Sequence, residues 1–149
     1  MSPIIILAVL VLGFLAVTGI LGAASLIVWR RHRSAGFPAR KIATHVSLQC
    51  ASIVIWLVFL ITMQPWIAWA AFASITVGQV FGDLLMFASY RARHRTARGG
   101  SNASARGDSY AAVARDVLGF SRPIPALHAI VGALGWFSML ATCILTTLT

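Results

Sequence analysis

The chain has 149 residues, of which 59% are hydrophobic and 10% are charged, and its mean hydropathy is +0.87. This hydrophobic content excludes a disordered chain. It also argues against a soluble enzyme, because too few charged residues remain to cover a water-exposed surface. Twelve Lys and Arg residues against three acids give a formal net charge of +9. The composition therefore indicates a single-domain membrane protein, residues 1–149, that crosses the bilayer several times.

Long uncharged runs locate the crossings. A helix needs about 20 apolar residues to cross the hydrocarbon core, and the second of three such runs is long enough for two helices that turn at Gln64-Pro65. The predicted fold class is an all-α membrane protein, a four-helix antiparallel bundle. We predict transmembrane helices over residues 4–29, 42–63, 67–90 and 125–147, joined by polar loops 30–41 and 91–122.

The positions of the cations predict the orientation. Every Lys and Arg falls in loop 30–41 or loop 91–122, so the positive-inside rule makes both loops cytoplasmic and both termini extracytoplasmic, N-out/C-out. No basic residue precedes the first apolar run, which argues for a retained anchor rather than a cleaved signal peptide. Because all but one of the twelve cations are arginine and alanine is abundant, we expect a bacterial plasma (inner) membrane.

The basic charge also suggests a partner. The sequence pI is near 11.6, but membrane topology already accounts for each cation, so we expect anionic lipid headgroups rather than nucleic acid. Between the third and fourth crossings, Tyr110, Val113, Val117 and Phe120 recur at helical spacing. This pattern predicts a short amphipathic helix at the inner membrane surface, over residues 110–120.

Polar side chains inside the predicted crossings are the candidate functional residues, because they are costly in lipid. Asp83 is the one acid in any crossing, and His45 and His128 are the two histidines there. His45 stands four residues beyond Lys41 and His128 six beyond Arg122, in two helices of the same direction. We therefore expect both imidazoles at one level near the cytoplasmic side, with Asp83 about a turn deeper.

Three hypotheses explain this constellation. In the first, His45 and His128 are the axial ligands of one b-type haem, since imidazole suits iron. Such a protein would be an electron-transfer or respiratory-type membrane subunit, and its overall plan resembles four-helix membrane cytochromes and respiratory-enzyme anchors. The resemblance covers the architecture and the two histidines. The other residues expected to bind the haem are Gly132 and Gly135, which would leave room for the macrocycle, and Arg40, Lys41 and Arg122, which would meet its propionates.

The second hypothesis is that His45, His128 and Asp83 bind a metal ion or relay protons in a transporter. The third is a non-catalytic accessory or scaffolding subunit, in which these side chains make hydrogen bonds between helices. Its partners would be other membrane subunits or further copies of the chain. No nucleophile–base pair or paired carboxylates occur in the sequence, so none of the hypotheses gives the protein catalytic activity of its own.

Overall fold

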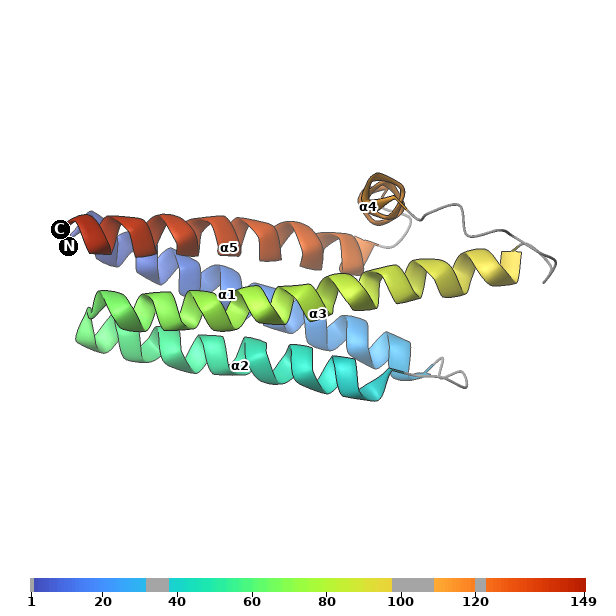
Figure 1. Cartoon of the computed structure of the whole chain (residues 1–149), viewed down its shortest axis with the longest axis horizontal. Coiled ribbons are helices and arrows are strands. Elements are labelled where there is room, and N and C mark those ends of the chain that lie inside the picture. Colours follow the sequence, from blue (N-terminus) through green and yellow to red (C-terminus); the bar gives the residue numbers. More distant parts are fainter. Residues whose placement is uncertain (1, 32–37, 98–108, 120–122) are drawn as a thin grey trace.

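The computed structural model describes the backbone of residues 2–31, 38–97, 109–119 and 123–149, and the side chains of these residues apart from 28–31, 92–97, 117 and 118. All five elements in this part of the chain are helices (Figure 1): α1 (Pro3–Arg31), α2 (Ala39–Thr62), α3 (Pro65–Ala97), α4 (Tyr110–Leu118) and α5 (Pro123–Leu148). Four of them, α1, α2, α3 and α5, are long and apolar enough to cross a membrane. For the described residues, the prediction of an all-helical fold with four helices able to cross a membrane is therefore confirmed.

The helix ends differ from the predicted ones where polar residues continue a helix. α3 runs to Ala97, beyond the predicted end at residue 90. Arginine and alanine favour helix, and the first glycine after this stretch is Gly99. α2 likewise begins at Ala39 rather than at residue 42, directly after Pro38. Hydropathy predicts only the apolar segment of a helix, and the hydrogen-bonded helix can continue into the polar residues on either side.

The turn between α2 and α3 is one residue earlier than predicted. Met63 has a left-handed backbone (φ 53°), and its N–H donates to the carbonyl oxygen of Phe59 at 2.7 Å, which closes α2. Pro65 is already the first residue of α3, a position where the missing N–H of proline has no helical partner to lose. The connection is therefore Met63-Gln64.

The four long helices lie side by side, with both termini at one end and α4 at the other (Figure 1). α2 packs along α3, α1 packs along α5, and smaller contacts join α3 to α5 and α1 to α2. In the described part of the chain α2 makes no backbone contact with α5, and α1 makes none with α3. These two pairs are therefore the diagonals of the bundle.

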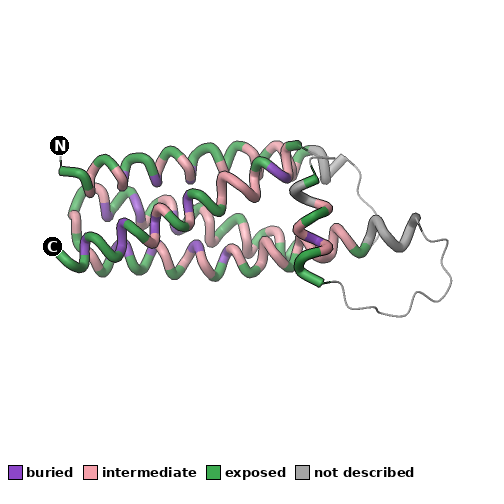
Figure 2. The backbone as a smooth tube through the Cα atoms, turned by 90° about the horizontal axis from the view of Figure 1, so that it is seen from above, coloured by how far each residue is buried: buried purple, intermediate pink, exposed green. Residues whose placement is uncertain are grey.

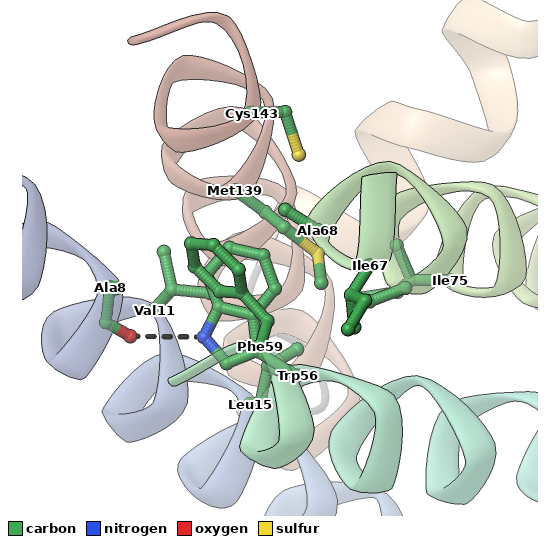
Figure 3. Packing of buried hydrophobic residues seen from close by; sticks show 11 residues of the cluster. Ala8, Val11, Leu15, Trp56, Phe59, Ile67, Ala68, Ile75, Met139 and Cys143 are labelled. Atoms are coloured by element: carbon green, nitrogen blue, oxygen red, sulfur yellow. Dashed lines mark hydrogen bonds between the residues drawn. The ribbon is translucent and has the colours of Figure 1, made fainter. Parts of the chain in front are cut away.

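The tightly packed core occupies the half of the bundle nearer the termini (Figure 2). Its centre is Trp56, which is fully buried beside Phe59, with ring centroids 4.8 Å apart. The indole Nε1 of Trp56 donates to the carbonyl oxygen of Ala8 at 3.0 Å and so joins α2 to α1 (Figure 3). Met139 and Cys143 of α5 complete this core. In the other half of the bundle, the described residues are mostly part-buried.

α4 crosses the end of the bundle opposite the termini, with its axis turned away from the other helices (Figure 1). The Ser109 hydroxyl caps it by accepting from the N–H of Ala112 at 3.2 Å. Val113 is fully buried, and the ring of Tyr110 lies 5.8 Å from that of Phe87 on α3. The short helix was predicted, but Val113 packs on protein rather than on lipid. The side chain of Val117 and the whole of Phe120 lie outside the described residues.

Candidate functional site

His45 and His128 meet inside the bundle. His45 comes from α2 and His128 from α5, two helices on a diagonal. Their imidazole centroids are 6.4 Å apart, and the ring planes are inclined at 76°. Two part-buried rings from opposite corners of the bundle thus approach each other at its centre, toward the end that carries the basic residues of α2.

Each imidazole is held by a backbone carbonyl of a neighbouring helix. Nδ1 of His45 lies 2.8 Å from the carbonyl oxygen of Gly78 on α3, and Nδ1 of His128 lies 3.0 Å from that of Thr18 on α1. A carbonyl oxygen only accepts hydrogen bonds, so Nδ1 carries the proton and donates in both rings. In the neutral imidazole this leaves Nε2 with its lone pair, available to a hydrogen-bond donor or to a metal.

Two glycines let the helix backbones reach these rings. A Cβ on Gly22 of α1 would lie 3.0 Å from Cε1 of His128, and a Cβ on Gly82 of α3 would lie 3.0 Å from Cε1 of His45. Such contacts are tighter than ordinary packing allows. Each histidine of one diagonal is therefore supported by a glycine of the other diagonal. One turn from His45, the amide Nε2 of Gln49 would meet a Cβ on Gly78 at 3.0 Å in the same way.

Gly22 and Gly82 were not among the predicted site residues, whereas the predicted Gly132 and Gly135 lie against α1. A Cβ on Gly132 would lie 3.5 Å from Cγ2 of Thr18, and one on Gly135 would lie 3.1 Å from Cβ of Phe14. Both glycines thus lie in the close packing of α5 on α1.

The predicted charged residues are only partly gathered at the site. Asp83 is part-buried and directly follows Gly82, the glycine that packs on His45. Within the described residues, however, no three His, Cys, Asp or Glu side chains form a group able to hold a metal ion, so Asp83 does not complete such a group with the two histidines. Arg40 and Lys41 are exposed in the first turn of α2. Arg122 lies outside the described residues.

Two hydroxyl groups on α1 are buried without a hydrogen-bond partner, Thr18 Oγ1 and Ser25 Oγ. Threonines elsewhere in the spans instead donate to the carbonyl oxygen four residues earlier, as Thr44 does to Arg40 at 3.0 Å. Thr18 and Ser25 flank Gly22, the glycine that packs on His128. The sequence pattern did not reveal them, because serine and threonine are common in membrane helices and their partners depend on the fold.

No protein-family model matches the chain, and no curated protein or solved structure is significantly similar to it. The geometry of the histidine pair is therefore the best indication of function.

Proposed function

We propose that His45 and His128 are the axial ligands of one b-type haem and that the protein is an electron-transfer subunit of a membrane. The observation that carries the proposal is the meeting of the two rings, 6.4 Å apart, from diagonal helices. A bound haem would supply one-electron transfer at its iron. The chain's part is to hold the ligands, to exclude water and lipid, and to balance charge.

The spacing of the rings suits a shared metal. An imidazole nitrogen lies about 2 Å from the metal that it binds, so two such nitrogens on opposite sides of one metal are about 4 Å apart and their ring centroids about 6 Å apart. His45 and His128 already have this separation. An inclination of 76° between the rings is also compatible, because axial rings on opposite sides are free to differ in rotation about their common axis.

The hydrogen bonds of the two histidines also suit a shared metal. Metal-binding histidines nearly always donate their second ring N–H to a carbonyl or carboxylate, which fixes the tautomer and the orientation of the ring. Gly78 and Thr18 provide these carbonyls for His45 and His128. Nε2 would then be the nitrogen that binds the iron in both histidines.

A flat ligand between the rings would require the helices to separate at the level of the histidines. The two helices that do not carry the histidines, α1 and α3, have glycines at this level, Gly22 and Gly82, so no side chain of either residue would have to move aside. Beyond the histidines toward the basic end, the fully buried described residues are Ala126 and Val113. Separating the helices here therefore disrupts far less apolar packing than it would around Trp56.

The end of the bundle that carries Arg40 and Lys41 indicates on which side of the membrane the site lies. We take it as cytoplasmic, which gives an antiparallel N-out/C-out bundle with the site near the inner leaflet of a bacterial plasma membrane. The exposed Arg40 and Lys41 in the first turn of α2 would balance the haem propionates or contact anionic lipid headgroups. Arg122 is expected to act with them.

An accessory or scaffolding subunit is the second candidate. Its support is that each histidine already links two helices through a backbone carbonyl, as a purely structural residue in a membrane bundle would. Such a subunit would act through other membrane proteins or further copies of the chain. The hypothesis of metal-ion or proton transport has less support, since the described residues offer no three-ligand group.

Haem content distinguishes these candidates. The protein would be expressed with ample haem, purified in detergent, and assayed for haem per chain and for a reduced-minus-oxidised visible spectrum. We expect about one haem per chain, lost in His45→Ala and in His128→Ala but retained in His32→Ala, the control histidine from the predicted loop. Folded wild-type protein without haem would contradict the proposal and favour the accessory role.

A further inference from the structure

We infer that Ser25 is a haem-binding residue whose hydroxyl donates a hydrogen bond to a haem propionate. This inference rests on the proposed function, because it needs the haem between His45 and His128. It adds an anchor on α1, a helix that carries neither axial ligand.

The first observation is the unpaired state of the Ser25 hydroxyl. Its oxygen is buried and has no partner, whereas two other interior serines donate across helices: Ser52 to the carbonyl oxygen of Ala71, and Ser74 to that of Leu48, both at 3.0 Å. A buried donor without an acceptor is costly, and native structures rarely leave one. An acceptor supplied by a bound ligand would remove this cost.

The second observation is the position of Ser25 relative to the histidine pair. Gly22 packs on the imidazole of His128. Ser25 lies three residues further along α1, on the same face and about 4.5 Å closer to the basic end. On α2, Lys41 precedes His45 by four residues, about 6 Å in the same direction. Ser25 and Lys41 therefore bracket the region just beyond the rings on the basic side.

The haem propionates are the groups that Ser25 is expected to bind. A haem held by the two histidines would lie at their level, and its propionates would form its anionic edge. That edge is expected to turn toward the cationic end of the bundle, where Arg40 and Lys41 lie. Both cations are exposed, whereas Ser25 is, among the described residues, the donor on this side whose hydroxyl is buried without a partner. A hydroxyl bonded to a carboxylate makes a strong, charge-assisted hydrogen bond.

Thr18 provides a matched comparison within α1. Its hydroxyl is also buried without a partner, but it lies four residues from Gly22 in the opposite direction, away from the basic end. A propionate turned toward Lys41 is out of its reach. Substitution of Ser25 is therefore expected to have an effect that depends on the propionate charge, and substitution of Thr18 one that does not.

The test is a titration of haem-depleted full-length protein in detergent with haem b and with its dimethyl ester, in which both propionates are uncharged. Ser25→Ala is expected to weaken haem b binding about tenfold and to leave binding of the dimethyl ester nearly unchanged. Ser25→Thr, which keeps the hydroxyl, is expected to preserve the wild-type preference for the free acid. Thr18→Val is expected to change both affinities equally. Thermal unfolding of each variant confirms that it is folded.

The outcomes separate the two proposals. If the wild type binds haem through the histidines but Ser25→Ala keeps the wild-type ratio of the two affinities, the Ser25 inference is wrong and the proposed function stands. If Ser25→Ala weakens both ligands equally, the role of Ser25 is packing and the inference is again wrong. If the wild type binds neither ligand, the proposed function fails and the inference fails with it.

Discussion

Gly82 lies against His45 so closely that a Cβ on the glycine would stand 3.0 Å from Cε1 of the imidazole. The contact joins α3 to α2 at the level of the histidine pair, and Nδ1 of His45 bonds to Gly78 one turn away on the same helix. The position of the ring is therefore set by two successive turns of α3. Gly22 holds His128 from α1 in the same way.

Gly82→Ala tests this relationship. The added methyl group must push the His45 ring or the α3 backbone aside, and overpacking of this kind costs about 1–3 kcal/mol. We expect a lower unfolding temperature and a loss of bound haem. Gly13→Ala is the matched control: nothing lies within 4 Å of its Cβ position, and alanine favours helix by up to about 1 kcal/mol over glycine. Equal stability of the two variants would show that Gly82 does not constrain His45.

Trp56→Phe tests whether the core can be destabilised without affecting the histidine site. The change removes the hydrogen bond from Nε1 to the carbonyl oxygen of Ala8, at 3.0 Å in a fully buried position. Loss of a buried hydrogen bond costs about 1–3 kcal/mol, so the unfolding temperature falls. The haem spectrum is expected to stay as in the wild type, because Trp56 lies in the half of the bundle nearer the termini. Trp66→Phe, at a side chain that is 68% exposed, is the control for the loss of an indole. A haem spectrum altered by Trp56→Phe would contradict the independence of the core and the histidine site.

Much of this architecture follows from the sequence, and the parts that do not have physical reasons. The uncharged runs predicted four crossings because lipid excludes charge along a helix of fixed length. The distance of His45 and His128 from the nearest cations placed both near one end. The order of helices around the bundle has no such one-dimensional signal. The sequence therefore assigned Gly132 and Gly135 to the site, whereas Gly22 and Gly82 contact the rings.

The ends of the helices and the unpaired hydroxyls were likewise beyond sequence patterns. α3 extends to Ala97 because helix propensity continues where hydropathy stops. Ser25 shows no distinguishing pattern, since a hydroxyl in a membrane helix usually bonds back to its own helix, as Thr44 does. Its lack of a partner is a property of the packed bundle.

Met63 carries a prediction about the α2–α3 turn. It holds a left-handed conformation, φ 53°, which costs a residue with a Cβ about 1–2 kcal/mol and costs glycine little. Met63→Gly is therefore expected to raise the free energy of unfolding by up to about 1 kcal/mol. Met63→Val should lower it, because β-branched residues tolerate this conformation worst. Denaturant titration measures both, and a stabilising valine would contradict the assigned turn.

Cysteine labelling tests the proposed orientation of the protein in the membrane. In a Cys50→Ser, Cys143→Ser background, Gln64→Cys places a thiol at the exposed α2–α3 turn, and Ser101→Cys places one in the predicted cytoplasmic loop. With intact cells, an impermeant maleimide is expected to label the first and to spare the second until the membrane is opened. The reverse pattern would invert the orientation and place the histidine site near the outer leaflet.

Electron paramagnetic resonance of the oxidised, haem-loaded protein tests the histidine pair most directly. Two imidazole ligands on one iron predict a low-spin ferric signal, and ring planes inclined at 76° predict a strongly anisotropic one. Replacing either His45 or His128 by alanine should abolish this signal, leaving high-spin iron or no haem. Persistence of the low-spin signal in both variants would contradict axial ligation by these two residues.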